Sequence, residues 1–115
     1  MAGALTEATK ENFRELVAEG VVLVDVWGPQ CGPCLALMPD VERLALARSD
    51  LRVIKLDSSK ARRLCIELRV MGLPAFLLFQ DGREVARLAA PDLTASRLME
   101  WVDATLATIA NGEVR

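Results

Sequence analysis

The chain has 115 residues, about the size of one domain, so we expect a single domain over residues 1–115. Hydrophobic residues make up 52% and charged residues 26%, as in a folded soluble protein rather than a disordered or fibrous one. The 14 basic and 16 acidic residues are spread along the chain and give a formal net charge of -2, which argues against a nucleic-acid partner. No apolar run approaches the ~20 residues of a membrane span and no signal-peptide pattern opens the chain, so we expect a cytoplasmic protein without membrane contact.

The counts of cysteine and histidine narrow the chemistry further. Three cysteines do not fit a secreted disulfide framework. In a reducing compartment a close cysteine pair is more often catalytic or metal-binding than structural. The chain has no histidine, which excludes imidazole metal ligands and Ser-His or Cys-His catalysis.

The first predicted element is a helix over residues 6–20, where Phe13, Leu16 and Val17 recur at helical spacing. A short edge strand could precede it at residues 4–5. Residues 21–26 follow as a run that is apolar except for one acid. This run is too short for a helix and too apolar for an exposed strand, so it predicts a central strand buried on both faces.

Two helices and a second strand occupy the middle of the chain. Pro33 opens a helix, because a proline suits the first helical turn. Residues 51–57 predict a strand, and residues 58–59 can cap a third helix whose apolar face includes Cys65. We interpret Cys65 as a core residue, since free cysteine is among the most buried residue types.

The last third predicts a hairpin and a final helix. Residues 75–79 and 84–89 are strands joined by a turn at residues 80–83, and the helix follows Thr94. Strands that alternate with helices pair in parallel through right-handed crossovers, and the hairpin adds an antiparallel edge. The predicted fold is therefore α/β, with a central mixed sheet of four or five strands flanked by four helices on both faces.

The sequence Cys-Gly-Pro-Cys at residues 31–34 lies where the central strand gives way to a helix. At a helix N-terminus the free N-H groups and the dipole favour a thiolate, so we expect a lowered pKa for Cys31. Cys34 follows one turn later and can form a reversible disulfide with it. Gly32 is expected to allow a tight turn, and Pro33 to fix φ where no N-H is needed.

Other interpretations of the pair stay open. A closed zinc site needs four ligands, and this chain has one further cysteine and no histidine. A four-thiolate site shared between two chains, holding zinc or an iron-sulfur cluster, is an alternative. A chance pair of core cysteines is another. The strand-to-helix junction favours redox chemistry over each of these.

Three segments, VDVWGPQCGPC, LRVIKLD and GLPAFLLF followed by an Asp-Gly turn, resemble the thioredoxin family in order and spacing over nearly the whole chain. The resemblance implies a thioredoxin fold and a thiol-disulfide oxidoreductase in which Cys31 attacks the substrate disulfide and Cys34 resolves the mixed disulfide. It also implies a cis peptide bond before Pro74, with Leu73 and Pro74 in the substrate-binding segment. A monomer without bound cofactor, disulfide-containing protein substrates and an electron donor of the thioredoxin reductase type are further implications.

The acid within the central strand, Asp25, is costly to bury in ionised form, so we expect a raised pKa and a role in accepting the proton of Cys34. By the resemblance, Asp25 matches the buried family aspartate, Lys55 the lysine near it and Trp27 the tryptophan that supports the active-site loop. The alternatives are an acid at a frayed strand end, a half-exposed lysine and simple core packing.

Several positions depart from the family pattern, and two of them flank the cysteine pair. Gln30 precedes the first cysteine where the family usually has tryptophan, and Leu35 follows the second where a lysine is usual. The loss of that lysine removes a positive charge near Cys31. We therefore expect an atypical family member with retained chemistry and altered partner choice. An oxidase or isomerase of the same fold, and a non-catalytic binding or metal-carrier module, are the alternatives.

Overall fold

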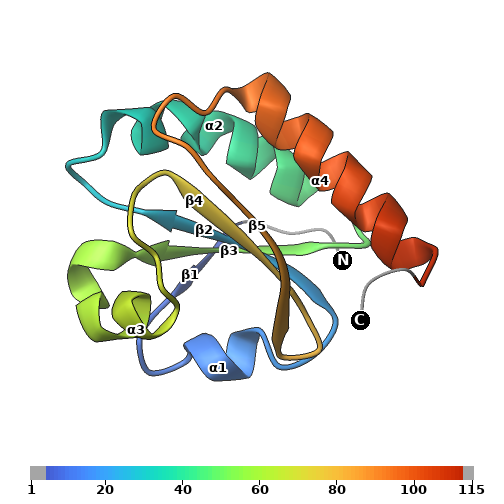
Figure 1. Cartoon of the computed structure of the whole chain (residues 1–115), viewed down its shortest axis with the longest axis horizontal. Helices are drawn as coiled ribbons and strands as arrows, with labels where there is room; N and C mark the ends of the chain where they lie inside the picture. The colour runs from blue at the N-terminus through green and yellow to red at the C-terminus, as the bar shows by residue number, and fades with distance from the viewer. Residues whose placement is uncertain (1–4, 113–115) are drawn as a thin grey trace.

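Five short strands, of which the central ones are rich in aliphatic residues, pair into one sheet in the computed structural model, which describes residues 5–112 (Figure 1). In chain order the elements are β1 (Thr6–Ala8), α1 (Phe13–Leu16), β2 (Val21–Trp27), α2 (Gly32–Ala47), β3 (Arg52–Asp57), the 3₁₀ turn η1 (Ser58–Lys60), α3 (Arg62–Glu67), β4 (Ala75–Gln80), β5 (Arg83–Ala89) and α4 (Ala95–Ala110). None of the helices in this part of the chain combines the length and the hydrophobicity that crossing a membrane requires.

The sheet is mixed, as the alternation of strands and helices predicted. Its strand order is β1-β3-β2-β4-β5. Strands β1, β3 and β2 are parallel, whereas β4 runs antiparallel to β2 and β5 antiparallel to β4. The central strand β2 is buried from Val22 to Val26, which confirms the interpretation of its apolar run.

Helices cover both faces of the sheet. Helices α1 and α3 pack on one face, and α2 and α4 on the other (Figure 1). Because side chains alternate along a strand, Val22, Val24 and Val26 enter the core under α1 and α3, whereas Leu23 enters the core under α2 and α4. Asp25 is in phase with Leu23 and therefore faces the layer of α2 and α4.

The predicted first helix is wrong for most of its length. Thr6–Ala8 form the edge strand β1, and α1 is limited to Phe13–Leu16. Pairing with β3 outweighs the helical spacing of the apolar residues. A turn separates the two elements, in which Thr9 N-H donates to Asn12 Oδ1 (2.7 Å) and Asn12 N-H to Thr9 Oγ1 (3.2 Å). Ala4, one of the two residues predicted as an edge strand, lies outside the described residues.

The third helix also begins differently from the prediction. Residues 58–60 form η1, and its cap is Asp57, whose carboxylate accepts hydrogen bonds from Ser59 N-H (2.9 Å) and Ser59 Oγ-H (2.7 Å). Helix α3 follows, and Cys65 is buried on its apolar face as expected. Burial raises the pKa of the Cys65 thiol, and the nearby Asp57 adds to that rise.

The C-terminal predictions are confirmed. Asp81 and Gly82 have positive φ values of 50° and 87°, as a two-residue hairpin turn between twisted strands requires. Thr94 caps α4, since its side chain accepts a hydrogen bond from Arg97 N-H at 3.2 Å. Helix α4 buries Leu98 and Val102 against the sheet.

Candidate active site

The two cysteines of residues 31–34 are joined by a disulfide at the start of α2. Their Cα atoms are 5.3 Å apart, within the usual range for such bonds. Cys31 is the N-cap of α2, and its Sγ accepts a hydrogen bond from Cys34 N-H at 3.2 Å. Cys31 is partly exposed, whereas Cys34 is only 1% exposed. A large substrate can therefore reach the first sulfur but not the second.

The helix start also favours negative charge on the exposed sulfur. Helix α2 has 16 residues, so its dipole and its free N-H groups are directed at Cys31. Pro33 lies in the first turn, where no N-H is needed. Gly32 was expected to allow a tight turn that other residues could not adopt. That expectation is wrong, because its φ is not positive and a Cβ there would meet no atom within 4 Å.

Close side-chain neighbours, by contrast, leave little room for a Cβ at Gly28 in the loop before the disulfide. A Cβ at this position would lie 3.3 Å from Leu73 Cδ1 and 3.3 Å from Ser58 Oγ. Cys31 N-H donates to the carbonyl of Gly28 at 3.0 Å and closes the loop. Gln30 is exposed on this loop. The loop thus packs against residues 58 and 73, and the amide side chain of Gln30 is exposed to solvent.

The segment before β4 lies beside the disulfide. Val26, near the end of β2, pairs with Ala75, the first residue of β4, so the two connections meet at one edge of the sheet. The Leu73-Pro74 peptide bond is cis, as the family resemblance implied. Leu73 separates two surface hollows of about 370 Å³ each, one lined by the loop from Gly28 to Cys31 with residues 58 and 59, the other by residues 71–72 and 89–91.

Met71 was not identified from the sequence as a residue beside the candidate site. Its side chain is 94% exposed and lines the second of these hollows. A methionine in this position offers a flexible apolar contact to a partner. Its place two residues before the Leu73-Pro74 bond is the signal that could have drawn attention to it.

Asp25, Lys55 and Trp27 lie together on neighbouring strands. Asp25 pairs in register with Lys55 across β2 and β3. The ammonium of Lys55 lies 5.6 Å from the centre of a Trp27 ring, a cation-π contact. Both Asp25 and Lys55 are where the resemblance implied, and the acid is in the middle of a buried strand rather than at a frayed end.

The carboxyl of Asp25 is buried without a hydrogen-bond donor from residues 5–112. It is 1% exposed, and neither of its oxygens receives a hydrogen bond from residues 5–112. Burial raises its pKa to about 7, and the nearby charge of Lys55 opposes that rise. Asp25 therefore exchanges a proton near neutral pH. Cys34 is buried in the first turn of α2, which packs on the same side of the sheet.

No three His, Cys, Asp or Glu side chains within residues 5–112 converge into a group that could hold a metal ion. The site consists instead of one accessible sulfur, one buried sulfur and a carboxyl that titrates near neutral pH. A disulfide of this kind at the start of a helix is the site of a thiol-disulfide oxidoreductase.

Comparison with known proteins identifies the family. The family model described as Thioredoxin matches residues 4–104. A thioredoxin of Acetoanaerobium sticklandii is 40% identical over 84% of this chain and 94% of its own length. A thioredoxin of Peptoclostridium acidaminophilum is 41% identical over 93% and 96%. The chain belongs to the thioredoxin family, and it is a thiol-disulfide oxidoreductase whose redox pair is Cys31 and Cys34.

Solved structures show the same fold. The short form of thioredoxin f from spinach chloroplast superposes with a TM-score of 0.80 at 28% identity, covering 89% of this chain and 93% of its own. A chain in the crystal structure of the complex of ferredoxin:thioredoxin reductase and thioredoxin f2 superposes with a TM-score of 0.80 at 24% identity, over 89% and 94%. The predicted thioredoxin fold is confirmed.

Proposed function

We propose that this protein reduces disulfide bonds in other proteins. In the dithiol form, the Cys31 thiolate attacks one sulfur of the substrate disulfide, breaks that S-S bond and releases a substrate thiolate. Cys34, as a thiolate, then attacks Cys31 Sγ, breaks the mixed disulfide and releases the second substrate thiolate. Two electrons pass to the substrate, which gains two protons as its thiolates become thiols. The observation that carries this proposal is the accessible Cys31 bonded to a buried Cys34.

Asp25 is proposed as the group that accepts the proton of Cys34 during the second step. Its support is burial beneath the layer of α2, the lack of hydrogen-bond donors within residues 5–112 and a pKa of about 7. Lys55 is a positioning residue in this proposal, since its charge keeps the pKa of Asp25 from rising further. Trp27, the last residue of β2, is proposed to support the loop that follows it, and its ring contacts Lys55.

Substrate binding is proposed at the edge where Leu73 and Pro74 lie beside the disulfide. The two hollows on either side of Leu73 support this assignment. Gln30 presents an amide where the family usually has an indole, and Leu35 presents an exposed apolar side chain where the family usually has a charge. We infer that these two departures make the protein an atypical family member in its choice of partners.

The electron donor is proposed to be an enzyme of the thioredoxin reductase type. Thioredoxin f2, which appears in a solved complex with ferredoxin:thioredoxin reductase, supports this choice of donor class. We further propose that the chain acts as a monomer of one domain in the cytoplasm. The free Cys65 in the core suits a compartment that keeps thiols reduced.

The reduction potential of the Cys31-Cys34 pair tests the direction of the reaction. Thiol alkylation across graded dithiothreitol and glutathione buffers should give a reduction potential of about -270 mV, the value typical of thioredoxin. A midpoint near about -120 mV, typical of a strong oxidant, would mean that the protein donates disulfides instead. A Cys34→Ser variant should also trap substrates as mixed disulfides with Cys31, and a Cys31→Ser/Cys34→Ser variant is the control for non-specific capture.

Gln30→Trp tests the altered recognition. We expect this variant to be reduced faster by a general thioredoxin reductase than the unmodified protein, because the indole restores the usual apolar contact beside the reactive sulfur. The rate of reduction by dithiothreitol, which needs no docking surface, is the control and should stay unchanged. Equal rates with the reductase would show that this position does not limit partner choice.

A further inference from the structure

Basic residues that are scattered in the sequence gather around α3 in the structure. An open hollow of about 600 Å³ between α1 and the segment η1-α3 is lined by five of them: Lys10, Arg14, Lys60, Arg62 and Arg63. Its acidic lining residues are Glu11 and Glu67. The excess is positive although the whole chain has a net charge of -2. We call these five cations the basic surface.

Most of these charges lack an acidic partner. Arg14 lies 3.7 Å from Glu67, and both side chains are largely exposed, so this pair is weak. The other four cations form no ion pair with any residue in the described range 5–112. Like charges held close together repel one another unless an anion lies between them. The basic surface is therefore suited to a negatively charged partner.

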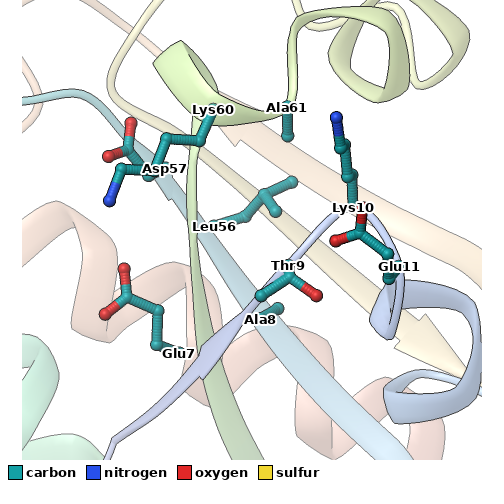
Figure 2. Close-up of a pocket in the computed structure, with 9 residues that line it drawn as sticks. All are labelled: Glu7, Ala8, Thr9, Lys10, Glu11, Leu56, Asp57, Lys60 and Ala61. Carbon is teal, nitrogen blue, oxygen red and sulfur yellow. The ribbon is translucent and has the colours of Figure 1, made fainter.

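A second hollow continues the basic surface on one side. Figure 2 shows this hollow, of about 300 Å³, with Lys10 and Lys60 on opposite sides and the buried Ala8 and Leu56 between them. It is also lined by three acids, Glu7, Glu11 and Asp57. Three acids against two lysines give this hollow an excess of one negative charge, so the positive excess lies on the side of α3.

The basic surface is continuous with the active site. Ser59 lines both the basic hollow and the hollow that contains Cys31. A chain whose disulfide sits at Cys31 can therefore pass over Ser59 and reach the exposed side chains of Arg62 and Arg63. These side chains are long and mobile, which suits a flexible acidic segment better than a small rigid ligand.

We propose that the basic surface binds an acidic segment that flanks the disulfide in a protein substrate. This inference rests on the proposed reduction of protein disulfides and adds the chemistry of the preferred substrate. Charge complementarity of this kind mainly raises the rate of association and selects between partners. Substrates with an acidic flank are thus reduced faster than otherwise identical neutral ones.

The test uses two peptides with the same disulfide, one with a glutamate arm and one with a serine-glycine arm of equal length. The second-order rate constant for oxidation of the dithiol protein is measured by stopped-flow tryptophan fluorescence. We expect an advantage of about tenfold for the acidic arm at ~0.01 M ionic strength, where the Debye length is about 30 Å. The advantage should vanish at ~1 M, where it is about 3 Å.

Charge-reversal variants assign the effect to this surface. Arg62→Glu/Arg63→Glu should abolish the advantage and leave the rate with the neutral arm unchanged, which also shows that the fold is intact. Arg83→Glu/Arg97→Glu makes the same change in net charge at two exposed positions outside the basic surface and should keep the advantage. An advantage lost equally in both variants would overturn the inference, because net charge alone would explain it.

An equal rate for the two arms in the unmodified protein would also overturn it. If such a protein also binds a single-stranded oligonucleotide, and Arg62→Glu/Arg63→Glu abolishes that binding, the surface is assigned to nucleic acid. If the dithiol protein reduces neither peptide, the proposed function fails first and this inference falls with it. Reduction of both peptides at one rate separates the two failures.

Discussion

Asp25 and Asp57 are the two buried acids of the described part of the chain, and their surroundings differ sharply. They are 1% and 6% exposed and lie on the neighbouring strands β2 and β3. Asp57 receives two hydrogen bonds from Ser59, whereas Asp25 receives none from residues 5–112. Burial alone therefore does not decide the role of an acid. Asp57 caps a helical turn, and Asp25 retains a proton to exchange.

The largest difference between the two acids should appear in the pH dependence of stability. The pKa of Asp25 is about 7 in the folded protein against a usual 3.8, so the folded state binds the extra proton between these values. The free energy of unfolding then falls as the pH rises from about 4 to about 7, by up to about 4 kcal/mol. Asp25→Asn should remove this slope and be more stable than the unmodified protein at about pH 8.

Urea melts across that pH range provide the measurement. Asp57→Asn is the matched control, because it removes a buried acid that has hydrogen-bond donors and should keep the slope. Parallel pH curves for Asp25→Asn and the unmodified protein would contradict the assignment of the raised pKa to Asp25.

The next difference should appear in the rate of reaction. Asp25→Asn removes the group proposed to accept the proton of Cys34, so resolution of the mixed disulfide should slow by about 100-fold at neutral pH. Asp57→Asn should leave the rate nearly unchanged. Stopped-flow measurement with a disulfide peptide from about pH 6 to about pH 9 checks both variants. A rate in Asp25→Asn that still rises with an apparent pKa near 7 would show that another group accepts the proton.

Loss of the Asp57 cap should have a smaller effect, on stability alone. Asp57→Ala removes the hydrogen bonds to Ser59 and should lower the free energy of unfolding by about 1 kcal/mol. Denaturant melts measure this loss. Ser59→Ala, which keeps the backbone N-H donor, should cost less. The reverse order would mean that the hydroxyl, and not the cap, carries the stabilisation.

The smallest effect should come from Lys55→Met. This variant removes the charge that opposes the rise of the Asp25 pKa, so that pKa should move higher. The midpoint of the pH-rate profile should move in the same direction, with little change in the maximal rate. Arg52→Met, on the same strand and exposed, is the control. An unchanged midpoint would show that Lys55 does not act on Asp25.

Local patterns were enough for the parts of the molecule where one strong signal dominates. The apolar run at residues 21–26 predicted the buried strand, and the Asp-Gly turn predicted the hairpin between β4 and β5. The helix expected over residues 6–20 failed, because β3 offers backbone hydrogen bonds to Thr6–Ala8 and no sequence window reports a pairing partner almost fifty residues away.

The candidate site was predictable in its chemistry and less so in its surroundings. Cys31, Cys34 and Asp25 stood out by residue type and position, since two thiols one turn apart can bond to each other and an acid is costly to bury in an apolar strand. Met71 had only its position before the Leu73-Pro74 bond to draw attention to it, because its exposure depends on how the segment before β4 meets the loop around residue 90.

The amino-acid sequence was enough to predict most of the alternation of strands and helices and the pair of thiols at a helix start, because these depend on neighbours within one or two turns. The fold was needed to show that Cys34 is closed to solvent while Cys31 is open, and that within residues 5–112 Asp25 has no hydrogen-bond donor whereas Asp57 has two. It also brought the cations around α3 together. Burial and charge clustering depend on chain segments far apart in sequence, and only packing around the sheet sets their distances.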